Sequence, residues 1–190
     1  MEWRTRLPLF RTMLQGLELR RILEVGCNRG HNLVALSEIF GPSTEIAGVE
    51  PNPHARALAR AASPLTSILA GHAYELPFRD RSFDLVFTWG VLIHVPLRSL
   101  GDALAEIHRV SAGYVLAVEY FAERETRIPY RGQDDLLWKR DFLRHYLEKF
   151  PDLALVRQGR WGHEHGADRV NWWLLRREVR AREGPTGRDG

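Results

Sequence analysis

Two carboxylates and two glycines near the start of the chain form its clearest chemical pattern. Glu24 stands just before Gly26 and Gly30 in EVGCNRG, and Glu50 follows twenty residues after Gly30. A glycine turn between a strand and a helix gathers free backbone N–H groups and the positive end of the helix dipole, which makes a small-molecule cradle. A carboxylate at the end of the next strand can accept both hydroxyl groups of an adenosine ribose. The spacing therefore predicts a site for an adenosine-containing ligand.

The turn itself favours a ligand without a diphosphate. A dinucleotide site needs the pattern GxGxxG, and this chain has Asn28 where the middle glycine would lie. S-adenosylmethionine carries adenosine but no phosphate and fits better. Gly26 would permit the tight turn, and Gly30 would let the helix lie against the strand. Cys27, Asn28 and Pro51 belong to the same two loops and are expected to contact the cofactor.

The residues named above lie at the ends of predicted strands and helices, which alternate along the chain. Strands are predicted over 21–25, 45–50, 65–71, 83–89, 112–120, 153–161 and 169–177, and helices after Gly30 and over 53–62, 100–110 and 139–150. This order predicts an α/β fold with a mostly parallel sheet covered by helices on both faces. The GHEHGAD segment between the last two strands is too short for a helical crossover, so these strands should be antiparallel neighbours.

Length and composition predict one domain over 1–178. A chain of 190 residues with 44% hydrophobic content can bury one sizeable core. We expect an N-terminal helix outside the sheet over 1–18, a lid or substrate loop over 121–138, and a flexible tail over 179–190.

Charge and cysteine usage limit the class of protein. The formal net charge is +3, and the segment from Arg176 to Gly190, with five arginines against three acids, supplies +2 of it. The rest is close to neutral, which argues against a nucleic-acid partner. One cysteine, no apolar membrane span and no signal peptide predict a cytoplasmic protein. His163 and His165 are interpreted as a solvated turn, so no metal site is predicted.

Four motifs in sequence order, EVGCNRG, GVEPN, GHAYELPF and FDLVFTWGVLIHV, resemble the successive motifs of class I S-adenosylmethionine-dependent methyltransferases. The resemblance implies a Rossmann-like sheet of seven strands with an antiparallel last strand. It assigns the methionine end of the cofactor to Glu24 and the ribose to Glu50. His72 stands where the family has an aspartate, so the adenine contact would pass to the backbone around Ala73. Trp89 would line the cofactor site and favour the sulfonium through its ring face. The alternative is that Trp89 is a tryptophan of the core.

Further along the chain, EYFAERETRIPYRG, KRDF, EKFPDLALV and NWWLL resemble the methylases associated with pseudaminic acid biosynthesis gene clusters. This resemblance implies a small-molecule acceptor, such as a sugar, an amino sugar or an intermediate of specialised biosynthesis.

Methyl transfer from a sulfonium needs alignment, exclusion of water and at most one base. His94, after the fourth strand, is the candidate base, with a packing or capping role as the alternative. Glu119 would hold a hydroxyl or ammonium of the acceptor, or pair with an arginine. Tyr120, Tyr130 and Arg131 are candidate acceptor contacts, and a guanidinium can grip a carboxylate or phosphate.

Two other functions share the adenosine pattern. One is an NAD-dependent oxidoreductase, and the other is a non-catalytic subunit that binds the adenosyl cofactor. Trp172 and Trp173 are predicted to be structural and to alternate faces on the last strand, with one facing the core and the other a helix or partner. An exposed aromatic last strand would allow a homodimer.

Overall fold

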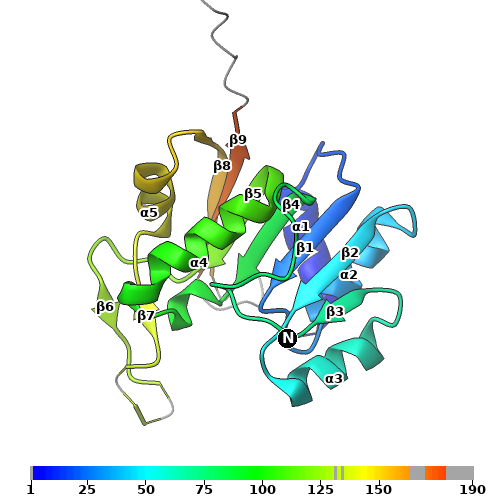
Figure 1. Cartoon of the computed structure of the whole chain (residues 1–190), viewed down its shortest axis with the longest axis horizontal. Coiled ribbons are helices and arrows are strands. Elements are labelled where there is room, and N and C mark those ends of the chain that lie inside the picture. The colour runs from blue at the N-terminus through cyan, green and yellow to red at the C-terminus, as the bar shows by residue number, and fades with distance from the viewer. Residues whose placement is uncertain (1, 131, 134, 163–169, 179–190) are drawn as a thin grey trace, which may run out of the picture.

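The structure is a computed structural model that describes residues 2–130, 132–133, 135–162 and 170–178 (Figure 1). Its strands are β1 (Arg21–Val25), β2 (Glu45–Val49), β3 (Ser67–Leu69), β4 (Phe83–Trp89), β5 (Ser111–Glu119), β6 (Thr126–Arg127), β7 (Trp138–Lys139), β8 (Leu153–Trp161) and β9 (Val170–Arg177). Its α-helices are α1 (Leu7–Met13), α2 (His31–Phe40), α3 (Pro53–Ala62), α4 (Leu97–Val110) and α5 (Phe142–Lys149), and its 3-10 helices are η1 (Trp3–Arg6) and η2 (Leu92–His94).

Seven strands form one sheet in the order β3-β2-β1-β4-β5-β9-β8. Strands β1 to β5 run parallel to one another, whereas β9 is antiparallel to both of its neighbours, β5 and β8. The predicted α/β class, the seven-stranded sheet and the antiparallel last strand are all confirmed.

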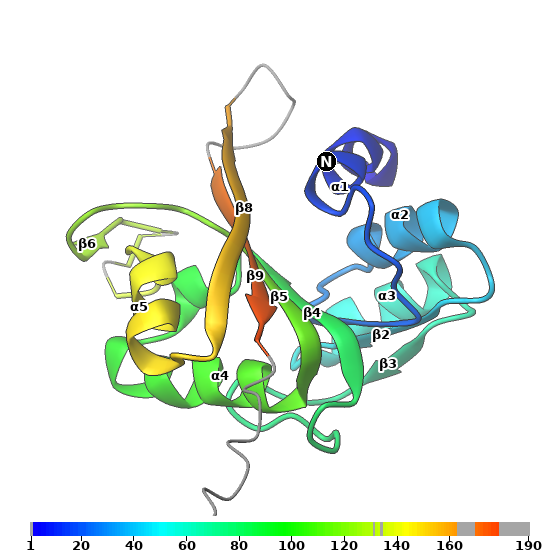
Figure 2. The same ribbon diagram turned by 90° about the horizontal axis from the view of Figure 1, so that it is seen from above.

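Alternation along the strands divides the core between the two faces of the sheet. In β1, Ile22 packs on the face covered by α1, α2 and α3, whereas Leu23 and Val25 pack on the face covered by α4 and α5 (Figure 2). Since successive strand residues alternate sides, Glu24 shares the first face with Ile22. The acid therefore lies one residue before the end of β1, on the face covered by the N-terminal helices.

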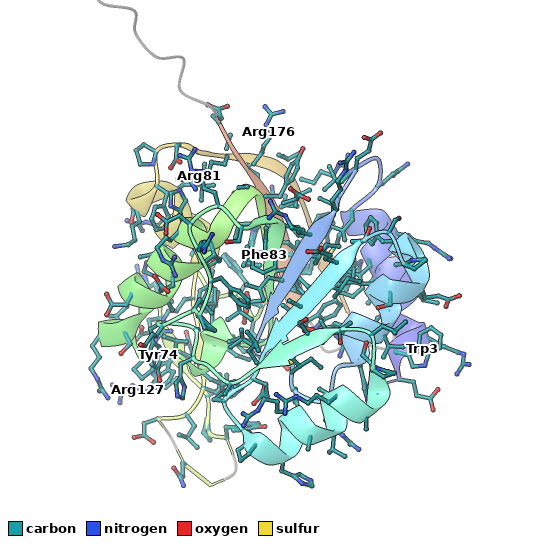
Figure 3. The ribbon with its side chains drawn as sticks, turned by 45° about the vertical axis from the view of Figure 1, so that its right-hand side comes forward. Trp3, Tyr74, Arg81, Phe83, Arg127 and Arg176 are labelled. Atoms are coloured by element: carbon teal, nitrogen blue, oxygen red, sulfur yellow. The ribbon has the colours of Figure 1, made fainter. Side chains whose placement is uncertain are left out.

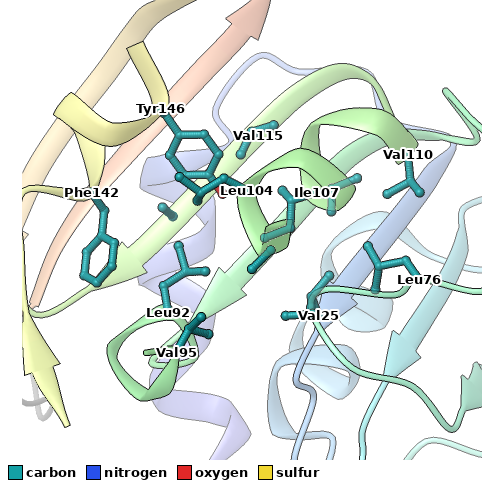
Figure 4. Packing of buried hydrophobic residues seen from close by; sticks show 14 of the residues in the cluster. Val25, Leu76, Leu92, Val95, Leu104, Ile107, Val110, Val115, Phe142 and Tyr146 are labelled. Atoms are coloured by element: carbon teal, nitrogen blue, oxygen red, sulfur yellow. The ribbon is translucent and has the colours of Figure 1, made fainter. Parts of the chain in front are cut away.

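Helix α4 supplies the largest part of the second layer. Its apolar residues recur at helical spacing, so that Leu104 and Ile107 both face the sheet and pack near Val115 (Figure 4). Tyr146 of α5 closes the same cluster and is fully buried. This packing fixes β4 and β5, which carry residues of the candidate site at their ends.

The parallel strands all end at one edge of the sheet. Tyr74 lies at this edge, and Arg81 and Arg176 lie at the opposite end of the molecule (Figure 3). In a parallel α/β sheet, ligands bind at the carboxyl ends of the strands. The candidate site must therefore lie beside Tyr74.

The N-terminal segment differs in detail from the single helix predicted over 1–18. It consists of η1 followed directly by α1, with Pro8 in the first turn of α1. The side of this segment that faces the sheet is buried and carries Leu9, Phe10 and Met13. Proline suits the first turn of a helix because its missing N–H is not needed there.

The segment 121–138 is more structured than a polar loop. Strands β6 and β7 pair in it, and the buried Arg140 just beyond it donates to Glu125 at 2.6 Å and to the Val95 carbonyl at 2.8 Å. The hairpin is therefore tied to the loop after β4. Sequence periodicity could not predict this hairpin, because strands of two residues are too short to show alternation. The burial of Arg140 was also not predicted, because arginine is a charged residue and is normally expected at the surface.

The prediction of an exposed aromatic last strand is wrong. Strand β9 lies between β5 and β8, and Trp172 and Trp173 face opposite sides with 5% and 3% of their surfaces exposed. Both rings belong to the core, one to each cluster. They offer no surface for a homodimer.

Within the described residues, no helix is both long enough and apolar enough to span a bilayer. The same residues contain no group of three or more potential metal-binding side chains. His163 and His165, interpreted above as a solvated turn, lie outside the described residues, as does the tail over 179–190.

Candidate functional site

The turn after β1 takes left-handed backbone at three positions. The φ angles are 78° at Gly26, 47° at Asn28 and 78° at Gly30. A Cβ on Gly26 would lie 2.5 Å from a methyl carbon of Val91, so only glycine lets this turn approach the loop after β4. The Gly26 N–H also donates to the Val49 carbonyl at 2.8 Å. The turn is thus held between the ends of β2 and β4.

Gly30 serves a different contact from the one predicted. A Cβ there would lie 3.1 Å from the Ala59 backbone of α3, so the close approach is to α3 and not to the strand. Gly30 also precedes the first residue of α2 as its N-cap.

Glu50, which follows β2, has a carboxylate fixed by two backbone donors. Its Oε2 accepts the Asn28 N–H at 2.8 Å, and its Oε1 accepts the Asn52 N–H at 2.9 Å. A carboxylate has about four acceptor positions, so two remain for a ligand. This is the capacity needed for the two hydroxyl groups of a ribose.

Glu50 lines a cavity of about 460 Å³. The predicted cofactor residues Pro51, His72, Ala73 and Trp89 line the same cavity. Sequence reasoning missed Tyr74, whose ring stacks on that of His72 with centroids 5.4 Å apart and planes 3° apart. The stacked pair gives the wall a flat aromatic surface suited to a nucleobase.

Glu24 lies in a second, more polar cavity of about 250 Å³. Its Oε1 accepts from Asn32 Nδ2 at 2.5 Å, whereas its Oε2 is buried and has no hydrogen-bond partner among the described residues. Burial raises the pKa of Glu24 to about 8, against the opposing effects of the Asn32 hydrogen bond and the Arg6 charge. The unused oxygen fits a cationic donor such as an ammonium group.

The two cavities meet at Trp89. Gly26, Asn28 and Trp89 line both of them. The Trp89 ring packs edge-on against Phe10, with centroids 5.4 Å apart, and lies 6.2 Å from the Trp161 ring. Trp89 therefore contacts core aromatics and also lines both cavities, whereas its ring lies under the Arg6 guanidinium, with the central carbon of Arg6 4.1 Å from the ring centroid.

Cys27 is buried at the same turn and packs against β2. A Cβ on Gly48 would lie 2.8 Å from the Cys27 sulfur, so Gly48 makes room for the thiol. Burial raises the pKa of Cys27, with smaller contributions from the charges of Glu24 and Glu50. The thiol is thus kept protonated, and Cys27 both packs against β2 and lines the smaller cavity.

His94 and Tyr130, predicted from distant parts of the chain, are brought together. Their rings lie 5.5 Å apart, and His94 lines the larger cavity. His94 Nδ1 lies 2.7 Å from the Leu136 carbonyl oxygen. Since a carbonyl only accepts, Nδ1 carries the proton and Nε2 of the neutral ring is left as a base. Arg131 lies outside the described residues.

Glu119 is enclosed and differs from both of its predicted roles. Its carboxylate accepts the backbone N–H groups of Val91, Leu92 and Ile93 at 3.1 to 3.3 Å. The side chain is fully buried, which raises its pKa to about 7, and among the described residues it lines neither cavity. Glu119 therefore holds η2, which ends in His94.

Tyr120 follows Glu119 at the end of β5. It is half-buried and packs against both hydrophobic clusters, with Lys139 Nζ 5.6 Å from its ring. Tyr120 therefore links the end of β5 to β7 through its contact with Lys139.

Comparison with known proteins finds similarity to methyltransferases. Residues 22–112 match the family described as "Methyltransferase domain". An uncharacterised methyltransferase of Schizosaccharomyces pombe is 34% identical over 149 residues, which is 71% of this chain and 52% of the relative. A demethylmenaquinone methyltransferase of Staphylococcus aureus is 33% identical over 107 residues, which is 52% of this chain and 42% of the relative. The chain thus spans about half, or less, of the length of these curated relatives.

Solved structures share the fold over nearly the whole chain. A protein of Pyrococcus horikoshii superposes with a TM-score of 0.73 at 17% identity, covering 93% of this chain and 91% of that one. The 1,6-didemethyltoxoflavin-N1-methyltransferase of Burkholderia thailandensis, solved with its substrate and S-adenosylhomocysteine, gives 0.70 at 17% identity and covers 93% and 78%. The chain therefore shares its Rossmann-like fold with these proteins.

Proposed function

We propose that this chain is an S-adenosylmethionine-dependent methyltransferase whose acceptor is a small molecule, such as a sugar, an amino sugar or an intermediate of specialised biosynthesis. The methyltransferase-domain match over 22–112 and the shared fold support the reaction class. The observation that carries the proposal is the pair of cavities that meet at Trp89, one with Glu50 and the other with Glu24.

The larger cavity suits the adenosine part. Glu50 has two acceptor positions left after its contacts with Asn28 and Asn52, and these match the two ribose hydroxyls. The stacked rings of His72 and Tyr74 would lie beside the adenine. Both features recognise a nucleoside and require no phosphate.

The smaller cavity suits the methionine part. The unused oxygen of Glu24 would accept from the ammonium group, and Trp89 at the junction would lie beside the sulfur of the cofactor. When bound, S-adenosylmethionine supplies an activated methyl group, so the protein has to orient the acceptor and exclude water.

The acceptor would lie beside His94. Nε2 of the neutral ring would take the proton from an acceptor hydroxyl or ammonium, while the Leu136 carbonyl continues to accept from Nδ1–H and so stabilises the charged ring. Glu119 would hold η2 and thereby orient His94. Tyr120, Tyr130 and Arg131 are proposed acceptor contacts, with the segment over 121–138 as the lid.

Isothermal titration with S-adenosylhomocysteine tests the cofactor. We expect binding by the wild type and a loss of at least about 10-fold in Glu50→Gln, because one of the two carboxylate oxygens becomes a donor. Glu38→Gln, a change on the exposed face of α2, is the matched control and should bind like the wild type. Binding of NAD in place of S-adenosylhomocysteine would support the oxidoreductase alternative and overturn the proposal.

Turnover separates an enzyme from a cofactor-binding subunit. The protein should transfer a labelled methyl group from S-adenosylmethionine to at least one member of a panel of sugars and amino sugars. Tight binding of S-adenosylhomocysteine with no transfer to any acceptor, small or macromolecular, would instead support the non-catalytic subunit.

A further inference from the structure

The N-terminal segment places a cation at the smaller cavity. Helix α1 is anchored by Phe10, whose ring packs against those of Phe87 and Trp89 with centroids 5.6 and 5.4 Å apart. Arg6 is the last residue of η1, immediately before α1, and its side chain lines the smaller cavity. The position of Arg6 is therefore set by aromatic packing onto the end of β4.

The guanidinium of Arg6 lies over Trp89. Its central carbon is 4.1 Å from the ring centroid, which is the geometry of a cation–π contact. The contact holds the planar group at the junction of the two cavities. The positive charge of Arg6 also lowers the pKa of Glu24, which opposes the effect of burial. Arg6 and Glu24 are thus electrostatically coupled across one small cavity.

The arrangement matches an α-amino acid. Such a group carries an ammonium and a carboxylate on one carbon, and Glu24 offers an oxygen for the first but nothing for the second. A guanidinium provides paired donors that fit a carboxylate bidentately. The N-terminus of α2, whose first residue His31 also lines the cavity, adds a positive potential at the same place.

We propose that Arg6 binds the carboxylate of the amino-acid tail of S-adenosylmethionine, so that the N-terminal segment completes the cofactor site. This inference rests on the proposed function. It makes Arg6 a specificity residue: it selects ligands that carry the amino-acid tail over adenosine thioethers that lack it.

Three probes, measured by isothermal titration, separate the parts of the ligand. S-adenosylhomocysteine carries both charged groups of the tail, decarboxylated S-adenosylhomocysteine keeps only the ammonium, and 5′-methylthioadenosine has neither. In Arg6→Met we expect the affinity for S-adenosylhomocysteine to fall by roughly 10- to 100-fold, the range for a charge-assisted hydrogen bond. Affinities for the other two probes should stay within about 2-fold of the wild type, given the usual scatter between neutral variants.

Matched variants guard against an indirect effect. Arg11→Met removes an exposed arginine from α1 and should leave all three affinities unchanged. Arg6→Lys keeps the charge without the paired donors and should recover only part of the affinity for S-adenosylhomocysteine. Retained binding of 5′-methylthioadenosine shows that each variant is folded.

Two results would overturn the role of Arg6. One is an unchanged affinity of Arg6→Met for S-adenosylhomocysteine, and the other is a parallel loss for all three probes, which would mean that Arg6 only supports Trp89. If the wild type binds neither S-adenosylhomocysteine nor 5′-methylthioadenosine, the proposed function itself fails, and this outcome is distinct from both.

Discussion

Glu50 accepts the backbone N–H of Asn28 at 2.8 Å, so the carboxylate after β2 holds the turn after β1. The bond places the acid beside the left-handed backbone of Asn28 and leaves acceptor positions directed at the larger cavity. Ligand recognition and turn geometry are therefore coupled through one side chain. A change at Glu50 should weaken binding both directly and by loosening the turn.

Gly26 should be intolerant of any side chain. In Gly26→Ala the new Cβ would meet Val91 at 2.5 Å, whereas Gly16, with a similar φ of 73°, has no atom within 4 Å of its Cβ position. Both variants place alanine in left-handed backbone, which destabilises each of them. The difference between their free energies of unfolding therefore measures the steric clash alone. We expect Gly26→Ala to be less stable than Gly16→Ala by about 2 kcal/mol in urea unfolding. Equal stabilities would show that Val91 moves aside freely.

The contribution of Glu24 to the stability of the unliganded protein should fall as the pH rises, whereas His108 and His145, whose pKa values burial lowers, act in the opposite direction. Burial raises the pKa of Glu24 from its ordinary 4.5 to about 8, so between these values the folded state holds a proton that the unfolded chain has released. This contribution to the free energy of unfolding then decreases from about pH 5 to about pH 8. Glu119, whose pKa burial raises to about 7, acts in the same direction. Glu24→Gln should remove the contribution of Glu24, and an unchanged pH dependence of urea unfolding would contradict the prediction.

Cofactor binding should release a proton near neutral pH. An ammonium beside the unused oxygen of Glu24 favours the charged carboxylate, and this brings the raised pKa back down. Calorimetric titration of S-adenosylhomocysteine near pH 7, in buffers that differ in ionisation enthalpy, measures the protons exchanged. We expect a net release of up to about one proton by the wild type and less by Glu24→Gln. Equal release by the two proteins would exclude Glu24 as the source.

His94 should act on the rate and not on cofactor affinity. His94→Gln keeps a polar side chain but lacks the basic Nε2, so kcat should fall by about 100-fold or more for an acceptor that must lose a proton. Binding of S-adenosylhomocysteine should change little. His54→Gln, at an exposed position of α3, is the control. An unchanged kcat would mean that alignment alone suffices for transfer.

Local patterns in the sequence were enough to predict the fold class and the glycine turn after β1. Apolar periodicity identifies β1, α2 and β2 because a strand or helix must keep one side towards the core, and that requirement is local. The left-handed positions of the turn are also local, and Gly26 marks one of them. Glu24 and Glu50 could be singled out because each is an acid at the carboxyl end of an apolar strand: Glu24 is the penultimate residue of β1, and Glu50 directly follows β2.

Which side chains share a cavity depends on contacts between distant parts of the chain. Several contacts join residues that are far apart in the chain. Arg6 contacts Trp89, Glu119 accepts backbone hydrogen bonds from η2, and the buried Arg140 donates to the Val95 carbonyl. No local pattern marks such pairs, since an arginine that will be buried looks the same in sequence as one on the surface. Likewise, Trp173 is buried because β9 lies between β5 and β8. The order of the strands depends on the packing of the whole sheet, so the residues of one strand do not reveal it.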